Sequence, residues 1–179
     1  MIKLNLGCGW RNFGDDWVHI DGGDYPHLNS HNVHKLDYSN DTVDLIYASH
    51  LLEYFDRDEA SNILKEWIRI LKPGGILRIA VPNFETIAHL YLEHNLSLEK
   101  FLGPLYGKMS MGNKTVYHKT IYDYYSLKSL VERLGMKNFK RYDWEKTEHS
   151  GFDDHSQAYI PHMDKENGTL ISLNVEACK

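Results

Sequence analysis

The sequence predicts an α/β fold in which helices cover a mostly parallel sheet. Three observations predict it: an opening strand over residues 2–6 that ends in a glycine turn, a strand, a helix and a strand in succession over residues 43–82, and a strongly alternating segment at residues 169–177. Strands that alternate with helical segments are typical of parallel sheets. Small molecules bind such sheets at the carboxyl ends of the strands, so we expect a ligand site there.

The rest of the chain is arranged around its first nine residues. Ile2 to Leu6 alternates apolar and polar residues, as a strand does, and leads directly into Gly7-Cys8-Gly9. Two glycines after an opening strand indicate a sharp turn that a ligand approaches too closely for a Cβ atom. We interpret this turn as the floor of a cofactor site.

The second predicted strand, residues 17–21, begins only seven residues after the glycine turn. Parallel strands are normally joined by a crossover of a dozen or so residues, usually a helix. The first crossover helix is therefore shortened or absent. Because this leaves one face of the sheet thinly covered near its centre, we expect either a self-association surface or cover from elsewhere in the chain.

The next elements form the most regular part of the chain. Residues 33–36 are a short third strand that ends at Asp37, and residues 43–48 are an almost wholly apolar fourth strand, as expected for burial on both faces. Apolar residues recur at helical spacing over residues 60–71 and give the clearest helix. Residues 76–81 then complete a β-helix-β unit as the fifth strand.

The second half of the chain is less regular. We expect two broken helices over residues 84–106 and a lid near residues 103–120. A helix capped by Ser126 should follow over residues 126–134, then a strand over residues 139–144 and a long polar loop over residues 145–168. A loop of that length is uncommon unless it has a function. The alternating residues 169–177 close the sheet.

Length and charge restrict the classes of partner. The 179 residues suit one domain spanning 1–179, and 25 acids against 20 bases give a net charge of −5, which works against binding to nucleic acid. No window approaches about 18 consecutive apolar residues, and the first 20 residues lack the pattern of a signal peptide. With only two cysteines, Cys8 and Cys178, we expect a reducing, cytoplasmic location, although a disulfide stays possible.

Two carboxylates follow successive predicted strands. Asp21 ends the second strand, where it can accept hydrogen bonds from both hydroxyls of a ribose, and Asp37 ends the third, where an adenine would lie. Leu36 or Tyr38 would pack on the base. The alternative is that both acids follow strands only because Asp favours turns.

At this point the chain resembles the class I S-adenosylmethionine-dependent methyltransferases. The family's successive motifs are matched, in order, by Leu4-Asn5-Leu6-Gly7-Cys8-Gly9, Asp21, Leu36-Asp37, Ser49-His50-Leu51-Leu52-Glu53-Tyr54 and Leu71-Lys72-Pro73-Gly74-Gly75. The resemblance covers residues 2–82 and implies a Rossmann-like, mostly parallel sheet of seven strands with an antiparallel C-terminal strand. More narrowly, the chain resembles small bacterial methyltransferase-like proteins often associated with cell-surface glycan genes.

The resemblance implies S-adenosylmethionine as cofactor, with the glycine turn against its methionine part, Asp21 on the ribose and Asp37 on the adenine. The residues implied to bind it are Leu6, Gly7, Cys8, Gly9, Arg11, Asp21, Gly22, Leu36, Asp37, Tyr38, Ser49, His50 and Leu51. The chain departs from the family at Arg11, which replaces a third glycine, and at Asn5, which stands where an acid is common. Arg11 either binds the cofactor's carboxylate in bidentate fashion or is a solvated surface residue.

Methyl transfer needs placement of the nucleophile and, for a hydroxyl or an amine, a base. His50 and His118 are the candidate catalytic residues, and His155, beside Asp153 and Asp154, is a third candidate. Three other histidines, His27, His31 and His34, match no usual zinc spacing, so we expect no metal. The tyrosines form a cluster that binds a sugar or ring or else fills the core: Tyr117, Tyr122, Tyr124 and Tyr125.

The leading hypothesis is methyl transfer to an oxygen or nitrogen of a small molecule or glycan precursor, by a chain that neither spans a membrane nor binds nucleic acid. Assembly into a homo-oligomer stays open. A nicotinamide-dependent oxidoreductase is a weaker rival, because the third glycine and a Tyr-x-x-x-Lys pair are absent. A second rival is a catalytically inactive cofactor-binding domain that acts by association. The sequence does not identify the acceptor.

Overall fold

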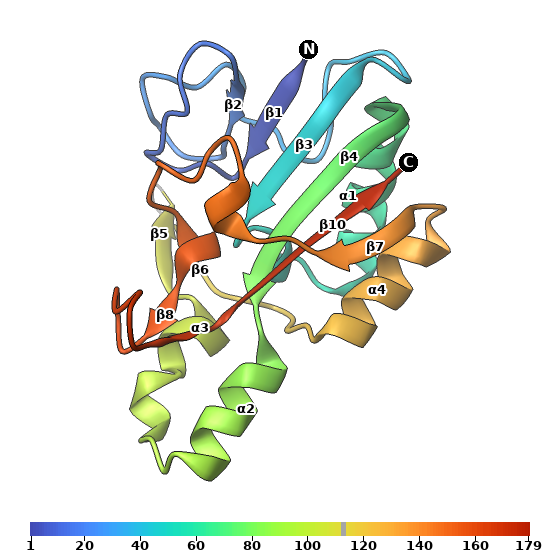
Figure 1. The fold of residues 1–179 in the computed structure, drawn as a ribbon. Coiled ribbons are helices and arrows are strands. Elements are labelled where there is room, and N and C mark those ends of the chain that lie inside the picture. Colours follow the sequence, from blue (N-terminus) through green and yellow to red (C-terminus); the bar gives the residue numbers. More distant parts are fainter. Residues whose placement is uncertain (112–113) are drawn as a thin grey trace.

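A six-stranded sheet forms the centre of the molecule in the computed structural model, which describes residues 1–111 and 114–179. Its strand order is β2-β1-β3-β4-β10-β7; β10 is antiparallel to both of its neighbours, and the pairs among β2, β1, β3 and β4 are parallel. The predicted α/β class with an antiparallel C-terminal strand is confirmed (Figure 1). The strands are β1 (Lys3–Leu6), β2 (Val18–Ile20), β3 (Val43–Ser49), β4 (Leu71–Pro82), β7 (Lys137–Arg141) and β10 (Ser172–Cys178).

Helices α1 and α4 pack on one face of this sheet and share the main apolar core with it. Helix α1 begins with a capping box, because Asp56 accepts from the backbone N–H of Glu59 and the Glu59 side chain accepts from that of Asp56 in return. Helix α4 is capped by Asp123 and not by Ser126, which instead takes the third helical position of a second capping box. The helices are α1 (Arg57–Ile70), α2 (Phe84–Glu93), α3 (Leu102–Tyr106) and α4 (Tyr124–Arg133), with short 3-10 turns η1 (Leu52–Tyr54), η2 (Leu98–Lys100), η3 (Trp144–Lys146) and η4 (His155–Gln157).

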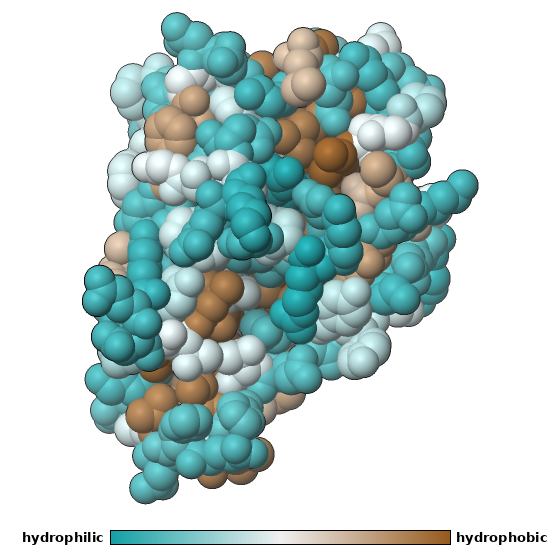
Figure 2. All heavy atoms as spheres, viewed as in Figure 1, coloured by the Kyte–Doolittle hydropathy of each residue, from teal (hydrophilic) through white to brown (hydrophobic). Residues whose placement is uncertain are grey.

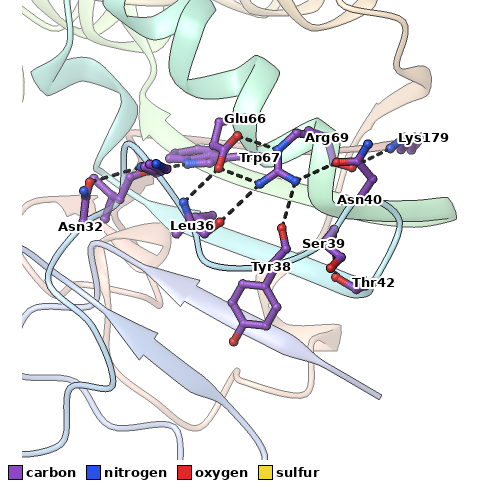
Figure 3. Close-up of polar contacts among 12 residues, drawn as sticks. Asn32, Leu36, Tyr38, Ser39, Asn40, Thr42, Glu66, Trp67, Arg69 and Lys179 are labelled. Carbon is purple, nitrogen blue, oxygen red and sulfur yellow. Dashed lines mark hydrogen bonds and ion pairs between the residues drawn. The ribbon is translucent and has the colours of Figure 1, made fainter.

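The strand predicted at residues 33–36 does not form, so the sheet has six strands where the resemblance implied seven. Side chains of α1 replace the missing strand ladder: Glu66 accepts from the N–H of Leu36, and Arg69 donates to the carbonyls of Leu36 and Tyr38 (Figure 3). Val33 and Leu36 are both buried, a spacing of three that a flat strand would place on opposite faces. The backbone is thus satisfied by a helix instead of a neighbouring strand.

The face of the sheet opposite α1 is covered by the loop between β7 and β8 (Tyr159–Ile160), coloured orange in Figure 1. No helix connects β1 to β2, as predicted from the short crossover. Phe13, in that crossover, stacks on His149 and Phe152 of the loop with ring centroids 5.4 and 4.7 Å apart, and the Tyr47 hydroxyl donates to Asp154 over 2.6 Å. Of the two predicted alternatives, the structure therefore shows cover from elsewhere in the chain.

Beyond the carboxyl ends of the strands lies a smaller lobe built from α2, η2, α3 and two hairpins. In Figure 2 the lower part of the molecule shows brown spheres among teal ones. Several large apolar residues of this lobe are exposed, among them Leu92, Leu98 and Leu102. The hairpins are formed by β5 (Met109–Met111) with β6 (Lys114–Val116), and by β8 (Tyr159–Ile160) with β9 (Thr169–Leu170). The region predicted as a lid, 103–120, includes residues 112–113, which lie outside the described residues. Among the described residues, no helix is long and apolar enough to cross a membrane.

Candidate functional site

A cleft of about 1880 Å³ opens where β1, β2 and β3 end, between the sheet and the smaller lobe. Ligand pockets are usually about 300–1,000 Å³, so this cleft has room for two small molecules side by side. One limb of the cleft is lined by the glycine turn and the loops after β2 and β3. The other limb is lined by Leu90, Leu96, Pro104, Ala158, Ile160 and Ile171.

The glycine turn forms the floor of the first limb. Gly7 and Gly9 have φ angles of +68° and +57°, which side-chain-bearing residues rarely adopt. A Cβ on Gly7 would lie 2.9 Å from the side chain of Leu51, so the turn is also packed tightly against the segment that follows β3. The glycine turn and the segment Ser49–Leu51, both predicted to bind the cofactor, therefore line the same cleft.

Asp21 lies beside the glycine turn, as predicted. Its carboxylate accepts from the backbone N–H of Gly9 over 2.9 Å and from that of Gly23 over 2.7 Å. Each carboxylate oxygen has two lone pairs, and each of these bonds uses one, so both oxygens keep acceptor capacity toward the cleft that Asp21 lines. The turn after β1, the turn after β2 and the Asp21 carboxylate therefore form one rim of the cleft.

Asp37 does not lie on this rim, and the expectation that it binds a base there is wrong. Neither Asp37 nor its neighbours Leu36 and Tyr38 line the cleft: Leu36 is buried under α1, and Asp37 is exposed. The backbone N–H of Thr42 donates to the carbonyl of Ile70 at the end of α1, which places this segment near the starts of β3 and β4. Because β3 begins at Val43, the chain has by this point returned to the end of the sheet where β3 starts, which is opposite to the end that carries the cleft.

The wall next to Asp21 is made instead by residues that the sequence reasoning did not select. Tyr25, His31, Val33, His34 and Phe55 line it, and the rings of His34 and Phe55 meet edge to face with centroids 5.2 Å apart. The available signal was weak: aromatic and imidazole side chains in the polar stretch after the second strand. Their flat apolar faces are the kind that pack on a planar base.

Of five other residues predicted to bind the cofactor, four line the cleft and one lies in the core. Gly22, Ser49, His50 and Leu51 line the cleft, whereas the Leu6 side chain is fully buried in the core. Asn5, the preceding residue of β1, lines the cleft instead. The Asn5 Nδ2 and Ser49 Oγ atoms are buried, and neither has a hydrogen-bond partner within residues 1–111 and 114–179.

Arg11 and Cys8 also line the cleft, with different chemistry. The Arg11 Nε–H donates to the backbone carbonyl of Asp153, which ties the first crossover to the loop that covers the sheet. Burial, reinforced by the charge of Asp21, raises the pKa of the Cys8 thiol to about 12, so the thiol stays protonated. Cys8 and Cys178 are both free.

The two predicted bases, His50 and His118, meet at a third residue, Glu53. His50 Nδ1 lies 3.3 Å from Glu53 Oε1, and His118 Nε2 lies 3.8 Å from the same atom. Both imidazoles line the cleft, and Glu53 is fully buried behind them in η1. The Glu53 carbonyl accepts from the N–H groups of Lys119 and Thr120, which holds the segment carrying His118 in place.

Burial dominates the electrostatics of this cluster. It lowers the pKa of His50 well below the usual range and lowers that of His118, and it raises the pKa of Glu53 to about 8. Glu53 belongs to the matched motif Ser49–Tyr54, but the resemblance implies no role for it. Its position three residues after His50 was the signal, since η1 places both side chains on one side.

The third candidate base, His155, lies with its ring centroid 5.2 Å from that of His50 and lines the cleft. Of the other histidines, His27 contacts the thiol of Cys8 and His31 contacts the carbonyl of Gly23. The tyrosine cluster separates: Tyr122 is buried, Tyr124 packs on Phe139, Tyr125 is exposed and Tyr117 lines the cleft.

A glycine turn, an acidic residue after the second strand and a cleft at the carboxyl ends of parallel strands define an α/β protein built to bind a nucleotide-type cofactor. Comparison with known proteins narrows this class. Residues 16–79 match a methyltransferase domain family.

Two curated relatives match the chain. A demethylmenaquinone methyltransferase of Protochlamydia amoebophila is 32% identical over 116 residues, which is 62% of this chain and 47% of that protein. A demethylmenaquinone methyltransferase of Chlamydia caviae is 44% identical over 61 residues, 34% of this chain and 26% of that protein. The chain therefore spans less than half the length of these relatives.

Solved structures share the fold. An S-adenosylmethionine-dependent methyltransferase from Archaeoglobus fulgidus matches with a TM-score of 0.59 at 14% identity, over 99% of this chain and 86% of that one. A Burkholderia thailandensis 1,6-didemethyltoxoflavin-N1-methyltransferase, solved with S-adenosylhomocysteine, matches with a TM-score of 0.55 at 14% identity, over 99% and 70%. The chain therefore shares the fold of class I S-adenosylmethionine-dependent methyltransferases, and its residues 16–79 match a methyltransferase domain.

Proposed function

We propose that this protein transfers the methyl group of S-adenosylmethionine to an oxygen or nitrogen of a small molecule or glycan precursor. One observation carries the proposal: the glycine turn and Asp21 share a hydrogen bond at the rim of a cleft that is large enough for a cofactor and an acceptor together. The family match supports the reaction class, and the acceptor class is our inference from the second limb.

The residues of the first limb suit an adenosyl cofactor. Asp21 offers free acceptor positions to ribose hydroxyls, and the glycine turn gives the ligand close access to the backbone. Asn5 and Ser49 present buried polar atoms without a partner among the described residues, so a polar ligand would satisfy them. The wall of His34 and Phe55 replaces Asp37 as the proposed contact for the base.

The sulfonium of the bound cofactor supplies an activated methyl group. The protein then has to exclude water, hold the acceptor in line and remove a proton where the acceptor needs it. His50 and His118 are the proposed groups for that proton, because both line the cleft. The described part of the hairpin β5–β6 is proposed as a lid, since Met111 packs against Gly22 at the cofactor limb.

Calorimetry of the purified chain tests the proposal. We expect S-adenosylmethionine and S-adenosylhomocysteine to bind and NADH to give no heat. Candidate acceptors incubated with methyl-labelled S-adenosylmethionine are then screened for label in the product. Preference for NADH would overturn the proposal. Binding without transfer to any hydroxyl or amine acceptor in the screen would instead favour the inactive binding domain.

A further inference from the structure

Neither carboxyl oxygen of Glu53 accepts a hydrogen bond from any group in residues 1–111 or 114–179. The side chain is nevertheless fully buried, and imidazole nitrogens of His50 and His118 face its Oε1 atom. An ionised carboxylate without a donor is one of the least favourable groups that a protein can bury. The hydrogen bonds around the two rings show why neither nitrogen donates to it.

A chain of hydrogen bonds fixes the tautomer of His50. The carbonyl of Ser156 can only accept, so it receives an N–H from Asn174, whose Oδ1 atom then accepts from the Ser172 hydroxyl. The hydroxyl has thereby used its proton, and its oxygen, 3.0 Å from His50 Nε2, must accept from that ring. His50 therefore carries its proton on Nε2, and Nδ1 presents a lone pair to Glu53.

A carbonyl fixes the tautomer of His118 in the same way. His118 Nδ1 lies 3.1 Å from the carbonyl oxygen of Pro104, which can only accept. The neutral ring then carries its proton on Nδ1, and Nε2 presents its lone pair on the side of Glu53 and of Gly107, which packs closely against it. Glu53 thus faces two acceptors and no donor.

We propose that Glu53 is uncharged in the folded protein, donates its carboxyl proton to Nδ1 of His50, and leaves Nε2 of His118 as the free base on the wall of the cleft. Only one proton is available for two lone pairs, and distance decides between them. His50 Nδ1, at 3.3 Å, is within reach of a hydrogen bond, whereas His118 Nε2, at 3.8 Å, is beyond it. Glu53 is therefore a positioning residue, and His118 is the residue that faces the acceptor.

The surroundings of the cluster favour its uncharged form. Burial raises the pKa of the Glu53 carboxyl and lowers those of both imidazoles, so the proton rests on oxygen rather than on a ring. The titratable and charged groups that act on the three residues or on their neighbours are Arg11, Tyr54, Arg57, Tyr122 and His155. Two of them, Arg11 and His155, oppose a further positive charge on His50.

The catalytic consequence rests on the proposed function. As the acceptor attacks the methyl carbon, its O–H or N–H bond breaks and the proton passes to Nε2 of His118. The new bond to carbon forms from the acceptor's electron pair, and the carbon–sulfur bond breaks with its pair left on sulfur. His118 becomes an imidazolium beside Glu53, whose carboxyl keeps its proton toward His50.

Nuclear magnetic resonance on the full chain tests the proton arrangement without any acceptor. The protein is labelled with ¹⁵N in histidine and ¹³C in the glutamate carboxyl. At pH 7 we expect one protonated glutamate carboxyl that titrates near pH 8, His50 as the Nε2–H tautomer and His118 as the Nδ1–H tautomer. An ionised Glu53 at pH 7, or the opposite tautomer of His118, would overturn the proposal.

Glu53→Gln assigns the carboxyl signal, and Glu145→Gln, which changes an exposed glutamate outside the cleft, is the matched control. In Glu53→Gln the side-chain amide donates a hydrogen bond as a protonated carboxyl does. We therefore expect the carboxyl signal that titrates near pH 8 to vanish and the tautomers of His50 and His118 to stay the same. If that variant does not fold, Glu53→Asp assigns the signal by shifting it. The calorimetric test of cofactor binding is independent of these spectra, so failure of one proposal is distinguishable from failure of the other.

Discussion

At the residue scale, Asp21 has a structural task as well as the proposed role of binding a ribose. By accepting from Gly9 and Gly23, its carboxylate joins the turn after β1 to the turn after β2. Asp37 has no such partners among the described residues and lies outside the cleft. The two acids therefore form a matched pair for testing which rim binds the cofactor.

Asp21→Ala is expected to weaken S-adenosylmethionine binding by about 1–3 kcal/mol, the usual loss for hydrogen bonds to a charged acceptor. This corresponds to a roughly 5- to 150-fold higher Kd. Asp37→Ala, the control, should bind as the unmodified chain does. Isothermal titration calorimetry measures both. An unchanged affinity in Asp21→Ala would reduce Asp21 to a turn residue, and an equal loss in Asp37→Ala would contradict the placement of Asp37.

At the element scale, the missing first crossover helix is replaced by two segments from distant parts of the chain. The crossover itself supplies Phe13, which is only 6% exposed, and the loop after β7 supplies the rings that stack on it. The same loop holds Arg11 at the edge of the cleft. Packing of this cover therefore stabilises both the sheet and one wall of the candidate site.

Phe13→Ala is expected to lower the free energy of unfolding by about 3–5 kcal/mol, because it leaves a cavity between β3 and the loop. Tyr125→Ala removes an aromatic ring that is 75% exposed and should change stability by less than about 1 kcal/mol. Urea denaturation followed by circular dichroism gives both values. A loss below about 1 kcal/mol in Phe13→Ala would mean that the loop does not pack on the sheet in solution.

At the scale of the whole molecule, buried titratable groups give stability a maximum in pH. Burial lowers the pKa of His149 to about 4, and it lowers those of His19, His50, His118 and His155. The unfolded chain binds protons at these histidines near pH 6.5, so stability is lost as the pH falls below that value. Glu53 acts in the opposite direction: the folded state holds its proton up to about pH 8, so its contribution is lost as the pH rises toward that value.

We therefore expect the melting temperature to be highest near pH 6.5 and to fall by pH 8.5. Glu53→Gln should flatten the alkaline side of this curve, because an amide has no proton to lose. Glu145→Gln, an exposed control, should leave the curve unchanged. Differential scanning calorimetry from pH 5 to pH 9 measures all three proteins. An alkaline loss of the same size in Glu53→Gln would show that another group causes it.

The sequence by itself determined the strand and glycine turn at the start, the capped helix α1, the absence of the first crossover helix and the antiparallel strand at the end. These features follow from local periodicity, from turn chemistry and from the length of one connection. It also selected Asp21, His50 and His118, because each stands at or near a recognisable turn. The predicted third strand failed because side chains of α1, far along the chain, satisfy the backbone of residues 33–38.

Only the tertiary structure decided that Asp37 lies away from the cleft, that His34 and Phe55 form the wall beside Asp21, and that Glu53 stands between two imidazoles. Each of these depends on where the chain returns after leaving the sheet, which no local pattern encodes. The protonation of Glu53 depends in addition on burial and on which atoms of Ser172 and Pro104 face the rings. Such properties arise from the environment that the whole fold creates around a side chain, and the residue type alone does not set them.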